Sequence, residues 1–219
     1  MGILIIPKVI IIVNRKIICG IIMKNKKAFF TTKWIAYTAM LTALVIATSF
    51  IPPVPIPPFG SLYWCDGIIF LTAYLLDPLA AFITGGIGTF LYDVIHGNAA
   101  MMFASLIIHG LQAAAVSAIM HYTRPKKLKK LEPLWAGVAS VVGGAIVIAG
   151  YFILRYYING YELIACGYKA VANVIQEVVG ITIGMIICYA TTFKQQLKKN
   201  NLLPDFKDEV LQKQTEEPQ

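Results

Sequence analysis

The sequence predicts an all-α integral membrane protein, a compact bundle of six transmembrane helices with both chain ends in the cytoplasm and a re-entrant outer loop between helices 1 and 2. Of its 219 residues, 58% are hydrophobic and 14% are charged, and the mean hydropathy is +0.69. A soluble domain is typically about half apolar and about a quarter charged. The apolar residues also form runs long enough to cross about 30 Å of hydrocarbon.

The spans are bounded by local signals. The first is expected over residues 34–51, because the proline-rich run over residues 52–58 ends it. The second is short, over residues 67–76, since Asp77 and Pro78 are typical of the N-cap and first position of the next helix. The remaining spans are expected over residues 78–95, 101–122, 134–157 and 166–193.

Basic residues predict the orientation, because cytoplasmic loops carry an excess of lysine and arginine. A six-span path places the basic clusters at residues 24–33, 124–130 and 194–199 on one side of the membrane. Only Arg155 and Lys169 fall on the other side. The basic residues behind the net charge of +8 are therefore expected to set the membrane orientation, and no nucleic acid partner is expected.

The chain is divided into four parts on this basis. Residues 1–22 are a doubtful N-terminal extension, because their apolar run is broken by polar residues and Met23 offers a second translation start. An interfacial or seventh helix is the alternative. Residues 23–33 form a basic cytoplasmic segment, residues 34–193 the transmembrane substrate-binding domain, and residues 194–219 a polar cytoplasmic tail.

Polar side chains inside the spans point to a solute site. Each is costly in a bilayer and calls for a partner, a cavity or a ligand. Any one of them alone could simply bond to a neighbouring helix. Because they come from four spans and fall in the outer half of the bilayer at about 1.5 Å of rise per residue, a shared cavity is favoured. They are Asp66, Asp93, His109, Gln112, Asn173, Gln176 and Glu177.

The segment before the short second span is expected to dip into the membrane. Irregular backbone at such depth persists only where protein or a water-filled cavity satisfies it, so residues 52–65 are interpreted as a lid over an outward-facing pocket. Tyr63 and Trp64 would give this lid aromatic faces that stack on a flat ligand. Tyr151 and Arg155, in contrast, are assigned to an interfacial belt.

Small residues mark close helix packing. Ala39, Ala43 and Ala47 repeat every four residues, which lets another helix approach, either within the bundle or from a partner protein. Glycines in the third, fifth and sixth spans are interpreted as internal packing points. These are Gly85, Gly86, Gly88, Gly143, Gly144, Gly180 and Gly184.

Catalysis, metals and cofactors are not expected. The sequence lacks a paired His or Glu metal motif, a G-x-S-x-G string and a G-x-x-x-x-G-K-[ST] loop. An intramembrane hydrolase using His109 or Glu177 is a rival, as is a self-sufficient secondary transporter, although no internal repeat is visible. The four cysteines have no metal-type spacing, and a disulfide between Cys65 and Cys166 is left open.

Several short strings, in their order and spacing, resemble the substrate-binding S components of energy-coupling factor (ECF) vitamin transporters. The similarity covers residues 33–193 and favours the branch associated with hydroxymethylpyrimidine and pyridoxine. Cys65 and Asp77 depart from the glycines of that pattern, and Tyr63 and Trp64 are also unusual, which leaves the choice of vitamin open. The strings are residues 39–43, 66–70, 75–78, 85–88 with Asp93, 106–112 and 173–176.

The resemblance implies a function in uptake. Such a chain binds a vitamin or precursor outside the cell and then associates with a transmembrane T component and two ATPase subunits, which supply the energy. Ala39, Ala43 and Ala47 would form the docking surface for the T component. The chain itself would not be an enzyme, would need no cofactor and would lie in the bacterial plasma membrane.

Overall fold

The computed structural model describes residues 32–123 and 131–191. The chain divides into two units, Met1–Ile35 and Ala36–Gln219. In the first unit only residues 32–35, which open helix α2, are described. The predictions for the N-terminal extension, the three basic clusters and the polar tail fall wholly or almost wholly outside the described residues. The architecture below is that of the second unit.

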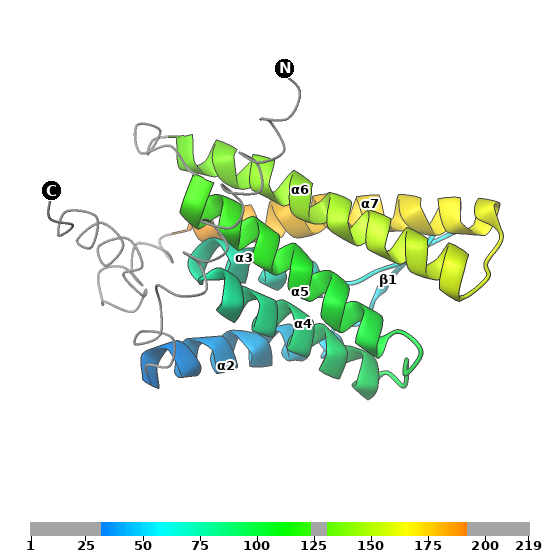
Figure 1. Cartoon of the computed structure of the whole chain (residues 1–219), viewed down its shortest axis with the longest axis horizontal. Helices are drawn as coiled ribbons and strands as arrows, with labels where there is room; N and C mark the ends of the chain where they lie inside the picture. Colours follow the sequence, from blue (N-terminus) through cyan, green and yellow to red (C-terminus); the bar gives the residue numbers. More distant parts are fainter. Residues whose placement is uncertain (1–31, 124–130, 192–219) are drawn as a thin grey trace, which may run out of the picture. The chain divides into compact units, whose positions relative to one another are not determined.

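The described residues fold into six α-helices (Figure 1). Helix α2 ends in a short 3₁₀ turn, η1, over Thr48–Phe50. Helices α5, α6 and α7 each continue into a π-helical turn: η2 (Ile119–Thr123), η4 (Leu154–Ile158) and η5 (Ile186–Ala190). The α-helices are α2 (Thr32–Ala47), α3 (Cys65–Leu75), α4 (Pro78–Ile95), α5 (Met102–Ala118), α6 (Glu132–Ile153) and α7 (Leu163–Met185).

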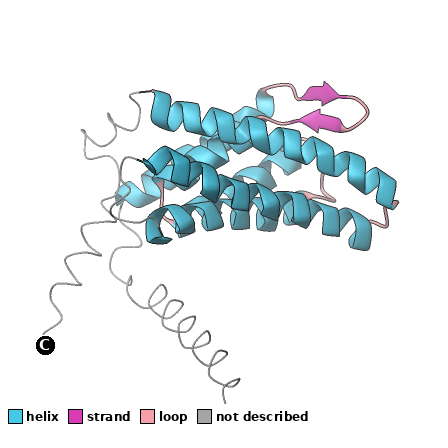
Figure 2. Ribbon diagram, turned by 90° about the horizontal axis from the view of Figure 1, so that it is seen from above, coloured by secondary structure: helices cyan, strands magenta, loops and turns pink. Residues whose placement is uncertain are grey.

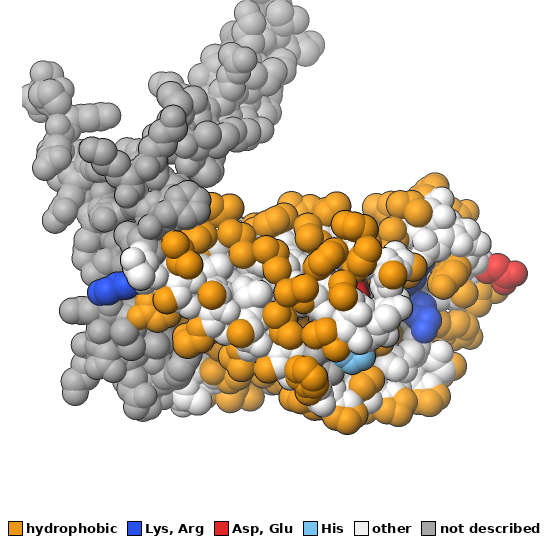
Figure 3. Space-filling model, turned by 90° about the horizontal axis from the view of Figure 1, so that it is seen from below, with side chains coloured by type: hydrophobic (Ala, Val, Ile, Leu, Met, Phe, Trp, Pro, Cys, Tyr) orange, Lys and Arg blue, Asp and Glu red, His pale blue; other side chains and the backbone are white. Residues whose placement is uncertain are grey.

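Four of these helices are long and apolar enough to cross a membrane: Pro78–Ile95, Met102–Tyr122, Glu132–Ile158 and Leu163–Ala190. Helices α2 and α3 are apolar but shorter, with 16 and 11 residues. The all-α class is therefore confirmed, and the predicted bounds of the third span are confirmed residue for residue. Hydrophobic side chains spread widely over the molecular face in Figure 3, as expected for lipid-facing helices.

Helix α4 begins where the local signal places it. The Asp77 carboxylate accepts hydrogen bonds from the backbone N–H groups of Leu79 and Ala80, at 3.2 and 3.4 Å. Pro78 occupies the first helical turn, where its missing N–H costs nothing. This capped start makes a tight turn after α3, so α3 and α4 are close neighbours in the bundle.

The predicted lid is a β-hairpin, not irregular backbone. Strands β1 (Val54–Ile56) and β2 (Gly60–Leu62) pair antiparallel, with Val54 opposite Leu62. The connecting turn holds a cis peptide bond between Pro57 and Pro58. The hairpin lies toward the end of the bundle where α6 connects to α7 (Figures 1 and 2).

Glycines let the helices that carry the polar side chains approach closely. A Cβ added to Gly85 on α4 would lie 2.7 Å from the backbone oxygen of His109 on α5. A Cβ added to Gly180 on α7 would lie 2.7 Å from the Cβ of Asp66 on α3. The packing role predicted for these glycines is confirmed. Both contacts bring a polar residue against a neighbouring helix.

Candidate functional site

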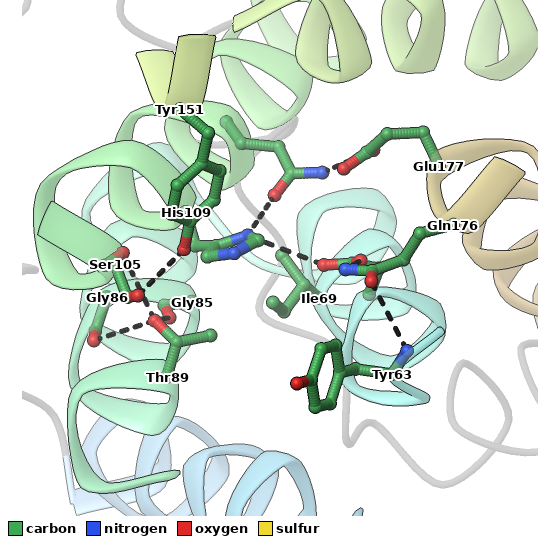
Figure 4. A network of polar contacts seen from close by, with 12 residues as sticks. Tyr63, Ile69, Gly85, Gly86, Thr89, Ser105, His109, Tyr151, Gln176 and Glu177 are labelled. Atoms are coloured by element: carbon green, nitrogen blue, oxygen red, sulfur yellow. Dashed lines mark hydrogen bonds and ion pairs between the residues drawn. The ribbon is translucent and has the colours of Figure 1, made fainter. Parts of the chain in front are cut away.

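Buried polar side chains from three helices form one connected network (Figure 4). His109 is at its centre, and its Nδ1 lies 2.7 Å from Gln112 Oε1 and 3.4 Å from Asp66 Oδ1. All three side chains are buried. Because the Gln112 oxygen can only accept, His109 Nδ1 carries the hydrogen, which fixes the tautomer of a neutral imidazole.

Helix α7 closes the network at two points. Gln112 Nε2 donates to Glu177 Oε2 at 2.8 Å, and Gln176 Nε2 donates to Asp66 Oδ2 at 2.5 Å. Residues 176 and 177 are adjacent on α7, so they contact different partners, one on α5 and one on α3. The three helices are thus linked through their buried faces by hydrogen bonds and by the contact between Asp66 and His109.

The hairpin segment joins the same network. The backbone N–H of Tyr63 donates to Gln176 Oε1 at 3.2 Å. The Tyr63 ring meets the Tyr92 ring edge-on, with centroids 5.8 Å apart. Partial burial, and next the charge of Asp93, raises the pKa of the Tyr63 phenol, so the phenol stays neutral at physiological pH. Tyr63 therefore covers the polar network as an uncharged aromatic group.

Tyr151, which the sequence analysis assigned to an interfacial belt, also contacts the network. The Tyr151 ring meets the His109 ring at a centroid distance of 5.7 Å and an angle of 60°. Its hydroxyl lies 2.7 Å from Ser105 Oγ, and Arg155 Cζ lies 5.1 Å from its ring centroid. The prediction that Tyr151 and Arg155 belong to an interfacial belt did not anticipate this contact. Their spacing of four residues, which places both on one helix face, was the available signal.

Five buried side-chain atoms have no hydrogen-bond partner among the described residues. Leaving such an atom unsatisfied costs about 1–3 kcal/mol. Native structures carry few of them, and a group of them marks a site for a missing polar partner. Three are carboxylate oxygens and two are nitrogen donors. They are Asp66 Oδ1, Asp93 Oδ2, Glu177 Oε1, Asn173 Nδ2 and Arg155 Nη1.

Three predicted residues lie outside this hydrogen-bond network, and two of them make other contacts. Asp93 Oδ1 accepts from Asn98 Nδ2 at 3.2 Å, which leaves only its second oxygen free. Trp64 Nε1 donates to the backbone oxygen of Pro52 at 3.1 Å, within the hairpin segment. Asn173 is half-buried on α7. The structure thus brings together six of the predicted residues and shows no hydrogen bond from Asp93, Trp64 or Asn173 to them among the described residues. The six are Asp66, His109, Gln112, Gln176, Glu177 and, through its backbone, Tyr63.

The described residues form neither a disulfide nor a metal site. Cys65 and Cys166 are both free and buried, so the disulfide that the sequence left open does not form. Within residues 32–123 and 131–191, no group of three or more His, Cys, Asp or Glu side chains could hold a metal ion.

The alanine stripe of α2 faces outward. Ala39, Ala43 and Ala47 are all exposed, as is Met40 between them. The opposite face of α2 packs on α4, where a Cβ on Gly88 would lie 2.7 Å from Val45 Cγ1. In the described part of the second unit, internal packing therefore does not explain the stripe.

Known proteins with a similar sequence support the membrane-transport character of this fold. A thiamine precursor transporter, HmpT, from Lactococcus lactis subsp. cremoris (strain MG1363) is 28% identical over 166 residues, covering 76% of this chain and 89% of the relative. An uncharacterised protein of the gap 3' region from Pyrococcus woesei is 30% identical over 142 residues, covering 64% and 88%.

A similar solved structure and a matching family model both point to the S components of ECF transporters. A solved structure described as the S component of a bacterial ECF transporter matches with a TM-score of 0.60 at 18% identity, covering 77% of this chain and 97% of the solved one. A family model described as "ECF-type riboflavin transporter, S component" matches residues 29–192. The resemblance inferred from the short sequence strings is confirmed, and this chain belongs to the family of ECF-type transporter S components that this model describes.

Proposed function

We propose that this chain captures a small heteroaromatic vitamin or vitamin precursor from outside the cell, as the membrane-embedded substrate-binding subunit of an ECF importer. The observation that carries the proposal is the buried polar network between α3, α5 and α7, together with five buried polar atoms that have no hydrogen-bond partner among the described residues. Small-ligand sites combine apolar walls with a few such fixed polar groups.

The roles of the residues follow from their positions. His109, Gln112, Asn173 and Gln176 would hydrogen-bond the ligand, while Asp66, Asp93 and Glu177 would orient it and brace the pocket. Tyr63 and Trp64, on the segment after β2, would close over it, and Tyr151 would form an aromatic wall beside His109. The HmpT relative is described as a thiamine precursor transporter, which supports a vitamin precursor as the ligand.

The chain would work with partners. A transmembrane T component would dock on the exposed alanines of α2, and two ATPase subunits would supply the energy. All six helices would cross or enter the bacterial cell membrane, with both chain ends in the cytoplasm. Helix α3, about 16 Å long at 1.5 Å per residue, would cover only part of the bilayer. The hairpin segment before it would then complete that crossing.

Mass spectrometry of small molecules that co-purify with the gently solubilised chain tests this function. We expect a heteroaromatic vitamin or precursor bound in a one-to-one ratio, and no uptake by proteoliposomes that contain this chain alone. Uptake by the chain alone would instead support a secondary transporter. Turnover of a lipid or peptide by the purified chain would support a hydrolase.

A further inference from the structure

Ser105 is a buried serine on α5, one helical turn before His109, to which the proposed function assigns no role. Residues four apart share one face of a helix. The Ser105 side chain reaches across to α6, where its Oγ lies 2.7 Å from the Tyr151 hydroxyl. Figure 4 shows the three side chains as neighbours. Ser105 and His109 thus both contact Tyr151, one through its hydroxyl and the other through its ring.

The backbone of Ser105 is held by helix α4. Thr89 Oγ1 donates to the Ser105 carbonyl oxygen at 3.2 Å. The two helices approach closely at this level, because a Cβ on Gly86 would lie 2.7 Å from the carbonyl oxygen of Leu106. Ser105 therefore offers a fixed position from which its hydroxyl can hold Tyr151.

The Tyr151 ring in turn packs against the His109 ring, with centroids 5.7 Å apart and an angle of 60° between the planes. Arg155 Cζ lies 5.1 Å from the Tyr151 centroid, within the roughly 6 Å range of a cation–π contact. The terminal torsions of Tyr and His side chains have broad preferences. Packing and hydrogen bonds, and not the torsions themselves, therefore set the planes of both rings.

We propose that Ser105 is a positioning residue of the candidate ligand site, which fixes the plane of the His109 imidazole through the Tyr151 ring. Because His109 Nδ1 carries the hydrogen, Nε2 is the acceptor nitrogen of the neutral ring. The plane of the ring sets the direction in which this nitrogen faces a solute. The assignment rests on the proposed solute-capture function, and Ser105 acts without touching the solute.

A second buried pair of tyrosine and serine supplies a matched control. The hydroxyls of Tyr74 on α3 and Ser140 on α6 lie 2.6 Å apart, and both side chains are buried. The Tyr74 ring contacts the rings of Phe70 and Tyr189. Among the described residues, neither member of the pair has a hydrogen bond or a ring contact with His109. Loss of a hydroxyl from either pair removes the same kind of hydrogen bond, so only an effect on His109 separates them.

The test observes the His109 ring by NMR in the purified full-length chain with isotope-labelled histidine. The chain has three histidines, and the His109 signals are identified by their loss in His109→Ala. Ser105→Ala and Tyr151→Phe each remove one hydroxyl of the proposed contact, and Ser105→Thr keeps a hydroxyl. Ser140→Ala and Tyr74→Phe are the controls. Affinities for riboflavin and for a hydroxymethyl aminopyrimidine are measured on the same samples.

We expect Ser105→Ala and Tyr151→Phe to displace the His109 ring signals. Ser105→Thr should keep the wild-type signals, and so should both control variants. For a probe that binds the wild type, the affinity should fall by about 2- to 13-fold in the two displaced variants, which is the range given by the energy of an aromatic pair.

His109 signals that stay in place in Ser105→Ala and Tyr151→Phe, or that move equally in the control pair, would overturn the inference. Displaced signals with an unchanged affinity for a bound probe would also overturn it, because the orientation of His109 would then not matter to the solute. If neither probe binds, the His109 signals alone decide the inference. A chain that binds no small solute at all contradicts the proposed function instead.

Discussion

Asp66 on α3 and His109 on α5 form a buried carboxyl–imidazole contact, with Asp66 Oδ1 3.4 Å from His109 Nδ1. The second oxygen of Asp66 accepts from Gln176 on α7. The Asp66 carboxyl group therefore contacts both α5 and α7. Stability and binding should both depend on this pair.

His109→Ala should destabilise the chain. The substitution leaves the buried Asp66 carboxyl group without its His109 neighbour, and leaving a buried polar group unsatisfied costs about 1–3 kcal/mol. Thermal unfolding of the purified chain in detergent measures the effect. The double variant Asp66→Asn/His109→Ala should be less destabilised than the sum of the single variants, because both changes remove the same contact. Strict additivity of the two changes would show that the side chains are not coupled.

Gly180→Ala should lower both stability and ligand affinity. The added Cβ would lie 2.7 Å from Asp66 Cβ and 3.2 Å from the Asp66 backbone carbon, so α3 must move away from α7. Overpacking of this kind costs about 1–3 kcal/mol. Gly137→Ala on α6 is the control, because a Cβ there meets nothing within 4 Å. It should be neutral or stabilising by up to about 1 kcal/mol, and equal unfolding temperatures for the two variants would argue against the packing role.

Ala39→Trp and Ala43→Trp should spare ligand binding and block uptake. Both positions are exposed on α2, so a large side chain fits the isolated chain but obstructs a docked helix. Binding is measured on the purified chain, and uptake in cells that express the chain with its partner subunits. Ala145→Trp, at an exposed position on α6, should leave both unchanged. Normal uptake in both α2 variants would place the docking surface elsewhere.

Tyr63→Ala should weaken binding mainly by faster ligand release. The backbone N–H bond to Gln176 survives, but the edge-on contact with Tyr92 is lost. Aromatic pairs of this kind contribute about 0.5–1.5 kcal/mol, or roughly a 2- to 13-fold change in affinity. Stopped-flow dissociation measures it. Tyr157→Ala, at an exposed position, is the control, and identical dissociation rates for both variants would show that Tyr63 does not cover the ligand.

Local signals explain why most helices could be predicted from the sequence. The N-cap and proline at residues 77 and 78 mark the start of α4, and the hydrophobic runs mark α5, α6 and α7 to within a few residues. The convergence of His109, Gln112 and Glu177 could also be predicted, because helix periodicity and depth place them at one level. Their partners could not, since pairing depends on how the helices rotate against one another.

The hairpin could not be predicted from the sequence, because contacts with a distant helix stabilise it. Proline is depleted in strands, so the run over residues 52–58 indicates irregular backbone by its composition. The structure stabilises the hairpin through contacts with α7: the Phe59 and Tyr168 ring centroids lie 5.9 Å apart, and the Tyr63 N–H bonds to Gln176. These contacts join residues more than 100 positions apart in the sequence, so no local pattern encodes them.

We propose that polar side chains from separate helices form one ligand site. Fluorescence titration of the purified chain with riboflavin and with a hydroxymethyl aminopyrimidine tests it most directly, in the wild type, His109→Ala, Asn173→Ala and the exposed control Asn159→Ala. We expect at least one compound to bind the wild type and the control equally, and to bind both site variants about tenfold or more weakly. Affinity that is unchanged in both His109→Ala and Asn173→Ala would contradict it.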